Sequence, residues 1–568
     1  MTACSIPVRS SWLIVGMTAA LCLFAAQAAP QIANFPAATA PAGGYRIAGT
    51  VVSKSDSRPL ARARITVTDV KDSHKFQSII TSEDGKYEFS GLPAGKYSLT
   101  GAKHGFVSAR YDQHDQYSTA IVTGAGLETE SLVLRLAPDA VITGKVLDEA
   151  GEPVRHATVT LYHDDHSSGV DQIRQYRSAQ TDDLGEYEMT PLQPGTYFLS
   201  ASGTPWYAVH PPSKSAPSDP ANSESEGQAE SPPTADRSLD VAYPVTYYPD
   251  ETEAASAMPI AIRGGELVQA DIHFNPVPSL RLLFRVPDAG NNRFFIPQLQ
   301  QLAFDGYTQV QTNFTSGASP GLFEVTGIPA GRYNIRLFGP GQGLQMTGVD
   351  LTKDGEEVDT SKAGAVGSVK FSVQIPGEPA SPPHLTVGLR SGSRMIAASQ
   401  SVDSKGEAEL PQVAAGRYEV AVWGGGKPYS IARISAEGAE VSGHALTLAA
   451  GSSPSVSLTL VGGSSEIQGT VTRAGKGFAG AMVVLVPKNP ELDRDLFRRD
   501  QSDLDGTFAL HGVVPGSYTL LAIENGWDLD WSQPTVITAY LKRGKKIEVG
   551  NQEARPMNVA DPVEVQSK

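Results

Sequence analysis

The sequence predicts an all-β protein of about five tandem Ig-like or prealbumin-like β-sandwich domains that follow a signal peptide. Three observations support this fold class. The phrase Gly-x-Tyr returns five times, always at the same distance from an earlier glycine. Apolar residues around the phrase alternate with a period of two, which is typical of half-buried strands. The 56 glycines and 40 prolines favour many turns and short strands over long helices.

Residues 1–28 are predicted to form a secretory signal peptide. Arg9 supplies the positive start, Trp12 to Ala26 is an apolar run, and Ala26-Gln27-Ala28 offers small residues for cleavage. A retained membrane anchor is the weaker alternative, because the run is shorter than the ~20 residues that cross hydrocarbon. Cys4 and Cys22 both lie inside this segment, so we expect no disulfide and no thiolate site in the mature chain. Export to a periplasm or to the cell exterior follows, with no membrane span in the mature chain.

The repeat organises the rest of the chain. Its second glycine and tyrosine are Gly95 and Tyr97, Gly195 and Tyr197, Gly331 and Tyr333, Gly416 and Tyr418, and Gly516 and Tyr518. Ten residues before each of these glycines stands another, at Gly85, Gly185, Gly321, Gly406 and Gly506. Asp-Gly at the first position, in copies one and five, is typical of a tight turn. Pro-Gly at the second, at Pro194-Gly195 and Pro515-Gly516, suits a type II turn. The spacing therefore predicts a hairpin with a turn, a strand, a corner and a return strand.

The tyrosine of each copy is expected to bury its ring in the core and to find a hydroxyl partner at the edge. Upstream, three copies open with a predicted first strand that contains Gly49-Thr50-Val51, Gly144-Lys145-Val146 or Gly469-Thr470-Val471. The third and fourth copies lack this phrase. Their first strands are predicted at Leu280 to Val286 and at Val369 to Ile375.

These elements predict β-sandwiches at residues 41–137, 138–278, 279–363, 364–462 and 463–553, of which the third and fourth are divergent. Residues 211–237, within the second sandwich, are rich in Pro, Ser, Ala and Glu and almost lack large apolar side chains. Such a segment buries too little apolar surface to offset its ordering entropy, so we expect a disordered acidic insertion. Residues 554–568 are polar and are expected to form a flexible tail.

Charge and motifs argue against several function classes. The formal net charge of −15 disfavours nucleic acid and anionic membranes, because both require a basic face. Neither His-x-x-Glu nor His-Glu-x-x-His occurs, which removes the common zinc peptidase arrangements. Gly317 to Gly321 matches the nucleophile-elbow string, but it falls at a repeated turn and not between a strand and a helix. We therefore expect no catalytic residue, no metal and no cofactor.

Three phrases of the first copy carry a resemblance to a known family. They are Pro-Leu-Ala-Arg-Ala at Pro59 to Ala63, the Asp-Gly turn within Thr81 to Tyr87, and the Gly-x-Tyr phrase within Leu92 to Leu99. Together they resemble the carboxypeptidase regulatory-like domain, which is close to the Cna B-type and transthyretin-like sandwiches and belongs to the carbohydrate-binding-like fold group. Copies one, two and five match well. The resemblance implies a non-catalytic accessory, adhesive or glycan-binding module, although its motifs are core and turn residues and specify fold more than function.

Aromatic residues in predicted loops are the remaining functional signal, since sugar rings stack on Trp and Tyr while their hydroxyl groups bind nearby acids. The carbohydrate-binding residues predicted on this basis are Trp527, Trp531, Asp528, Asp530, Trp206, Tyr207, Tyr247 and Tyr248. The alternative is that these rings cap the open ends of the sandwiches.

The first hypothesis is thus an exported, non-enzymatic protein that binds a polysaccharide or an exported or cell-surface protein. The second is a structural spacer or scaffold of the cell envelope. The third is an accessory part of a peptidase or glycan-processing system.

Overall fold

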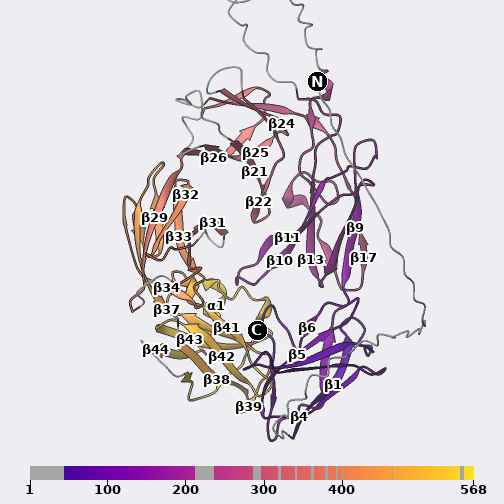
Figure 1. Ribbon diagram of the computed structural model, residues 1–568, viewed down its shortest axis with the longest axis vertical. Coiled ribbons are helices and arrows are strands. Elements are labelled where there is room, and N and C mark those ends of the chain that lie inside the picture. Colours follow the sequence, from indigo (N-terminus) through magenta and orange to yellow (C-terminus); the bar gives the residue numbers. More distant parts are fainter. Residues whose placement is uncertain are drawn as a thin grey trace, which may run out of the picture. The chain divides into compact units, whose positions relative to one another are not determined.

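The structure is a computed structural model that describes residues 44–210, 236–285, 296–316, 322–339, 342–359, 364–377, 382–391, 394–399, 401–463, 465–550 and 556–568. The strands form successive sets of facing sheets, coloured along the sequence in Figure 1. This confirms the predicted fold class of tandem β-sandwiches.

The first sandwich has the sheets β4-β1-β8 and β3-β2-β5-β6, and β7 also pairs with β5. Its strands are β1 (Tyr45–Ser53), β2 (Arg64–Asp69), β3 (Phe76–Ile80), β4 (Lys86–Leu92), β5 (Gly95–Ala102), β6 (Ala109–Arg110), β7 (Ile121–Thr123) and β8 (Leu132–Leu136).

The second sandwich has the sheets β11-β10-β13-β15 and β12-β9-β17, joined by β16, β18 and the pair β14-β19. Its strands are β9 (Ala140–Leu147), β10 (Thr158–Asp165), β11 (Gln172–Gln180), β12 (Glu186–Leu192), β13 (Gly195–Ser202), β14 (Val241–Ala242), β15 (Thr246–Tyr247), β16 (Ile260–Ile262), β17 (Leu267–Gln269), β18 (Ile272–His273) and β19 (Val277–Pro278).

The third sandwich has the sheets β23-β24-β20-β27 and β22-β21-β25-β26-β28. Its strands are β20 (Leu280–Arg285), β21 (Ile296–Ala303), β22 (Gly306–Gln309), β23 (Asn313–Ser316), β24 (Leu322–Ile328), β25 (Gly331–Gly339), β26 (Gln342–Leu351), β27 (Glu356–Asp359) and β28 (Gly364–Ala365).

The fourth sandwich has the sheets β32-β29-β37-β34 and β31-β30-β33-β36-β35. Its strands are β29 (Gly367–Gln374), β30 (Thr386–Ser391), β31 (Arg394–Ala398), β32 (Glu407–Val413), β33 (Gly416–Trp423), β34 (Tyr429–Glu437), β35 (Glu440–Ser442), β36 (Ala445–Leu448) and β37 (Ser455–Gly462). The predicted first strands of these two copies are therefore present as β20 and β29.

The fifth sandwich has the sheets β39-β38-β42 and β41-β40-β43-β44. Its elements are β38 (Ser465–Arg473), β39 (Lys476–Gly477), β40 (Met482–Pro487), β41 (Arg498–Gln501), β42 (Thr507–Val513), β43 (Gly516–Glu524), α1 (Pro534–Leu541), β44 (Lys545–Val549), β45 (Met557–Asn558), β46 (Val563–Glu564) and β47 (Gln566–Ser567). Short 3-10 helices occur at η1 (Arg237–Leu239), η2 (Ala254–Ser256), η4 (Arg494–Leu496) and η5 (Gly526–Asp528).

The two strands that flank the Gly-x-Tyr phrase do not pair with each other. In the first sandwich β4 pairs with β1, whereas β5 pairs with β2 in the opposite sheet. The same separation holds for β12 and β13, β24 and β25, β32 and β33, and β42 and β43. The predicted hairpin is therefore wrong, and the phrase is a corner at which the chain crosses between sheets. Alternation identifies the face that each side chain takes, but it does not identify the neighbouring strand.

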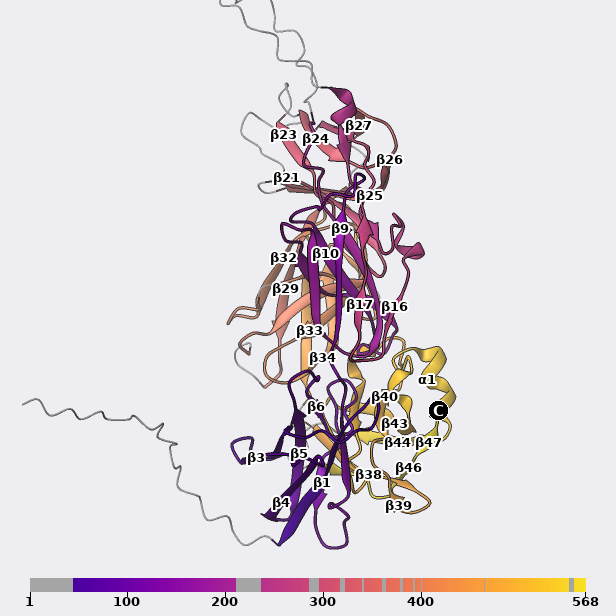
Figure 2. The same cartoon turned by 90° about the vertical axis from the view of Figure 1, so that its right-hand side faces the viewer.

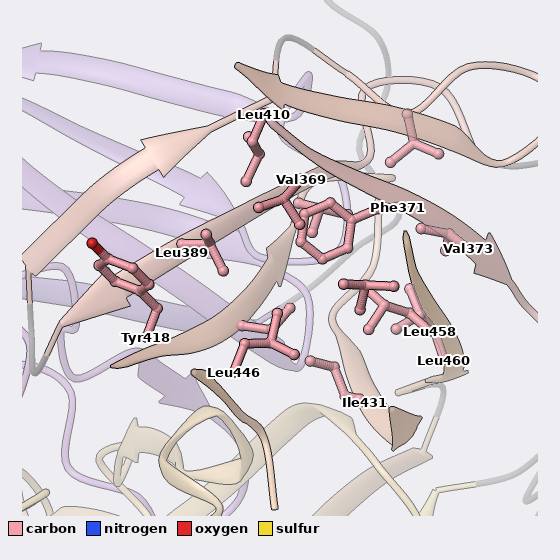
Figure 3. Close-up of a cluster of buried hydrophobic side chains, with 14 of the residues drawn as sticks. Val369, Phe371, Val373, Leu389, Leu410, Tyr418, Ile431, Leu446, Leu458 and Leu460 are labelled. Atoms are coloured by element: carbon pink, nitrogen blue, oxygen red, sulfur yellow. The ribbon is translucent and has the colours of Figure 1, made fainter. Parts of the chain in front are cut away.

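The repeated tyrosine fastens this corner in every copy. Its hydroxyl donates a hydrogen bond to the backbone carbonyl four residues earlier, at Pro93, Gln193, Pro329, Ala414 and Val514, with distances of 3.1, 2.9, 2.7, 3.1 and 2.7 Å. All five rings are at most 8% exposed. Burial raises the pKa of Tyr197 and of Tyr518 to about 12. This arrangement is a tyrosine corner, and it confirms the prediction of a buried ring with a bonded hydroxyl. Figure 3 shows Tyr418 in the core of the fourth sandwich with Leu389 and Leu446.

The two glycines of the repeat serve different purposes. Gly85, Gly185, Gly406 and Gly506 have φ between 71° and 86°, so the predicted tight turn with positive φ is present where the structure describes it. A Cβ on Gly85 would also lie 2.7 Å from the Val51 carbonyl oxygen. Gly321 lies outside the described residues. The type II turn predicted at Pro194-Gly195 and Pro515-Gly516 is wrong, because φ of Gly195 is not positive and φ of Gly516 is 156°, whereas this turn requires ~+80°.

The C-terminal residues belong to the fifth sandwich. β45 and β46 pair in parallel with β38, and β47 pairs in parallel with β43. Val563 is only 4% exposed and Gln566 only 7%. The expected flexible tail is therefore wrong for residues 556–568. Its strands are two residues long and polar, so periodicity does not reveal them.

The predicted signal peptide, residues 1–28, lies outside the described residues, as do residues 211–235 of the predicted insertion. Among the residues that the structure describes, no helix is long and apolar enough to cross a membrane.

Candidate functional site

The segment Gly526–Trp531 follows β43 and carries half of the predicted site residues. Trp531 is 8% exposed and packs with Phe497 and Ile537 against the outer face of the sheet that contains β40. The ring centroids of Trp531 and Phe497 lie 5.7 Å apart. Trp531 therefore presents no free ring face, and as a buried core residue it leaves the set of sugar-stacking candidates.

A continuous apolar stretch in β40 indicates why this second core exists. All six residues of β40 are buried, because one face lies between the sheets and the other lies under Trp531 and α1. An uninterrupted apolar strand is the pattern of a strand covered on both faces. This apolar stretch is the sequence signal from which a second core, on the outer face of the fifth sandwich, could have been predicted.

Trp527 contacts side chains of the first sandwich. Its indole stacks on His114, with centroids 5.0 Å apart and planes 7° from parallel, and lies 5.7 Å from Tyr117. The Arg499 guanidinium is 4.2 Å from the Trp531 ring, 5.2 Å from Tyr117 and 5.9 Å from Trp527. Burial lowers the pKa of Arg499, whose side chain is 4% exposed. These rings and the cation form one cluster whose contacts are intramolecular.

The two carboxylates of the segment are also engaged within the chain. Asp530 accepts a hydrogen bond from the Asp171 backbone amide at 2.8 Å and from the Gln533 side chain at 2.8 Å. Asp528 forms an ion pair with Lys568, and this contact lowers the pKa of Asp528. The prediction had assigned both acids to sugar hydroxyls, whereas the structure pairs them with backbone and side chains of the protein.

The contacts continue into a buried polar network between Asp112–Ala120 of the first sandwich and Arg499–Asp503 of the fifth, which we call the 1–5 junction. Gln501, 1% exposed, donates from Nε2 to the Thr119 hydroxyl at 2.8 Å and to the Asp112 carbonyl oxygen at 2.5 Å. Asp503 accepts from the Ala120 amide at 3.0 Å and from Lys96 at 2.5 Å. Buried polar groups are as a rule hydrogen-bonded, and these two side chains find their partners across the junction.

Trp206 and Tyr207, which follow β13, form a different kind of site. Trp206 is 82% exposed and meets Tyr207 edge to face, with ring centroids 5.8 Å apart. The Tyr207 hydroxyl donates to Oε1 of Glu149, and the Tyr243 hydroxyl donates to Oε2 at 3.2 Å. Burial acts to raise the pKa of Glu149, but hydrogen bonds from the Tyr207 hydroxyl, from the Glu149 backbone amide and from the Tyr243 hydroxyl together outweigh it and lower that pKa. The site therefore combines an open indole face with an ionised, oriented carboxylate.

Tyr247 and Tyr248 do not extend this surface in the same way. Tyr247 is 1% exposed and its ring meets Phe304 of the third sandwich edge to face at 5.6 Å. Burial raises the pKa of Tyr247. It is a core residue, so it also leaves the set of candidates. Tyr248 is partly exposed and packs against the core of the second sandwich.

Sequence reasoning missed Glu149 and Tyr243 as partners of Tyr207. Tyr243 is distant in sequence and Glu149 is one acid among many, so no local pattern links them. Among the described residues, no group of three or more His, Cys, Asp or Glu side chains is placed to hold a metal ion.

Comparison with known proteins identifies the first two sandwiches. Residues 46–127 and 141–211 match the family model of the carboxypeptidase regulatory-like domain, as the sequence resemblance predicted. No curated protein matches the chain significantly.

Solved structures similar to the chain include a streptococcal ancillary pilin, with 15% identity, coverage of 55% of this chain and 98% of that chain, and a TM-score of 0.19. The minor pilin of Streptococcus agalactiae shows 13% identity, coverage of 41% and 97%, and a TM-score of 0.19. The Bacillus anthracis TIE protein shows 8% identity, coverage of 92% and 73%, and a TM-score of 0.17.

Proposed function

Because its first two sandwiches are carboxypeptidase regulatory-like domains, we propose that the chain is an exported, non-catalytic β-sandwich protein that binds carbohydrate through the Trp206–Tyr207 loop. The observation that carries this proposal is the 82% exposure of Trp206, whose ring meets Tyr207, the residue that donates a hydrogen bond to the Glu149 carboxylate. A large aromatic ring left open to solvent is typical of a binding surface, because a ring this size usually finds cover.

The chemistry of the loop suits a sugar. The open indole face offers an apolar platform for the C–H face of a pyranose ring. Each Glu149 oxygen already accepts one hydroxyl group from the protein, and a carboxylate oxygen can accept more than one hydrogen bond. The carboxylate thus stays fixed in orientation while it accepts sugar hydroxyls. Hydrogen bonds to a charged acceptor are the stronger class.

The test is a binding screen of the chain without residues 1–28 against a broad polysaccharide panel. We expect a saturable hit that weakens at least about tenfold in Trp206→Ala, since one lost stacking contact of ~1.5 kcal/mol corresponds to that factor. Trp423→Ala is the matched control, because Trp423 is a partly exposed indole, 38% exposed, in the fourth sandwich. A hit that both variants retain equally would contradict the assigned loop.

A second candidate function, a structural scaffold of the cell envelope, is favoured by the 1–5 junction. There Trp527, in the segment with two tryptophans, contacts His114 and Tyr117 of the same chain. If this role holds, the polysaccharide panel stays blank and Trp527→Ala lowers thermal stability with no effect on any ligand.

A further inference from the structure

The edge strand β3 of the first sandwich exposes apolar side chains. β3 lies at the end of the order β3-β2-β5-β6 and, among the described residues, pairs only with β2, and Figure 2 labels it at the border of its sheet. Phe76 and Ile80 are both 61% exposed. No charged residue and no proline occurs from Phe76 to Ile80. An edge of this composition is a template for another strand.

The free backbone groups of this edge can be assigned from the register. Thr81 donates its amide to Ala63, and Lys75 accepts at its carbonyl from Asp69, so odd-numbered residues direct their backbone groups toward β2. Backbone direction alternates along a strand in an antiparallel ladder. The amides and carbonyls of Phe76, Ser78 and Ile80 therefore point outward from the sheet.

The corresponding edges of the second and fifth sandwiches carry charged side chains and contact a neighbouring part of the chain. β11 of the second sandwich carries Arg174 and Arg177 and receives an Asp305 carboxylate on the Ile173 amide at 2.8 Å. β41 of the fifth carries Arg498, Arg499 and Asp500 and lies in the 1–5 junction. Charged side chains are the usual protection of an edge strand. By contrast, β3 combines an apolar composition with an open edge.

We propose that β3 pairs with β3 of a second copy of this chain, so that the two sheets join into one across a two-fold axis. An antiparallel pair centred on Ser78 places each Ser78 opposite the other and Phe76 opposite Ile80 of the second copy. The outward backbone groups of the three residues then satisfy each other. Aromatic and β-branched side chains directly opposite are a favourable cross-strand pair, and this symmetry is that of an isologous dimer.

Charge at the ends of the strand does not oppose this register. Lys75, which precedes the strand, pairs with Asp72 at 3.3 Å, and Asp84, which follows it, pairs with Lys86 at 2.6 Å. The charges that flank the strand are therefore neutralised within each chain, and the register depends on the backbone groups and on the Phe76 and Ile80 side chains. A pair of five-residue strands buries much less than the ~1,200 Å² of a stable interface, so the dimer is expected to be weak and to form only at high protein concentration. The proposal does not depend on carbohydrate binding.

A cysteine trap tests the register. In the proposed pair the Ser78 Cα atoms are ~5.5 Å apart, within the range that a disulfide spans, whereas two Gln77 residues are diagonal neighbours at ~7–8 Å. Ser78→Cys is expected to give a disulfide-linked dimer on mild oxidation of the full chain, in at least several-fold higher yield than Gln77→Cys. The wild-type chain is run alongside, so linkage through Cys4 or Cys22 appears in all samples.

Sedimentation velocity over a range of concentrations tests the association itself. Ile80→Lys should abolish the concentration-dependent dimer, whereas Leu184→Lys, which changes a 57% exposed residue of the second sandwich, should leave it intact. Both sites are exposed, so both variants should fold. A chain that stays monomeric at all concentrations, or equal cross-linking of the Ser78→Cys and Gln77→Cys variants, overturns the proposal. Dimers that persist in the Ile80→Lys variant would also overturn the proposal.

Discussion

Asp500 should make the fifth sandwich less stable at neutral pH than at mildly acidic pH. It lies on β41, and its Oδ2 accepts the Ala509 amide of β42 at 2.7 Å. Burial raises the pKa of Asp500 to about 6, and Asp503 adds to the rise, while the backbone amides and His511 oppose it. Asp500→Asn removes the charge and keeps an oxygen acceptor for Ala509.

The sign follows from proton binding. Between the ordinary value of 3.8 and about 6, the folded state holds a proton that the unfolded state has released, so stability falls as pH rises. The stabilising effect of the protonated form is fully present below pH ~4 and is lost as pH passes through the folded pKa, above which the cost is ~3 kcal/mol. The Asn variant lacks this loss. Any change that the Asn amide group itself makes to the free energy of unfolding does not depend on pH, so it cancels when the stability difference at one pH is compared with that at another.

We therefore expect the stability difference, Asp500→Asn minus the parent chain, to grow by ~3 kcal/mol between pH 4 and pH 8. The assay is urea unfolding followed by tryptophan fluorescence in a Trp206→Phe, Trp423→Phe chain without residues 1–28, in which Trp527 and Trp531 report on the fifth sandwich. Glu491→Gln, at an exposed carboxylate of the same sandwich, is the control and should give a flat difference. A flat or falling difference for Asp500→Asn would refute the reasoning.

Two further predictions concern single hydrogen bonds and a buried amide. Tyr518→Phe removes the 2.7 Å bond to the Val514 carbonyl and should lower the stability of the fifth sandwich by ~1 kcal/mol, measured by the same unfolding assay; an unchanged midpoint would count against the corner. Gln501→Ala leaves the Thr119 hydroxyl and the Asp112 carbonyl without their buried donor, so it should weaken the 1–5 junction by ~2–3 kcal/mol. Amide hydrogen exchange should then accelerate at Asp112–Ala120 but not in β1, and equal exchange at both places would contradict the assignment.

Local features of the fold were predictable because their causes are local. The burial of Tyr97 and its counterparts follows from a short phrase that contains both the turn and the ring. The positive φ of Gly85 follows from an Asp-Gly pair. The predicted hairpin failed because a strand of period two fits either sheet equally well, and its partner, β1 or β2, lies 28 to 47 residues away in sequence.

The candidate site was less predictable, because the contacts that decide which aromatic side chains stay exposed come from residues far away in sequence. Two Trp and two Asp in one loop suggest a ligand platform, and Trp206 beside Tyr207 suggests the same. The two loops differ in how the rest of the chain contacts them. Trp527 stacks on His114, which is more than 400 residues earlier in the sequence, whereas Trp206 is open. No window of sequence around either loop contains that difference.

The repeat determines what the five sandwiches have in common, and their edge strands determine how they differ. The Gly-x-Tyr corner is the same in every copy and therefore cannot tell the sandwiches apart. Their edge strands differ, and the differences match what each edge contacts: β41 is charged and contributes Gln501 to the 1–5 junction, β11 carries arginines and donates its Ile173 amide to Asp305, and β3 is apolar and, among the described residues, pairs only with β2. Since the corner does not involve these edge strands, the edges are free to vary, and the choice of neighbour is made there. The partners of this chain should accordingly be sought at the surfaces that its own sandwiches leave open, the Trp206–Tyr207 loop and the β3 edge.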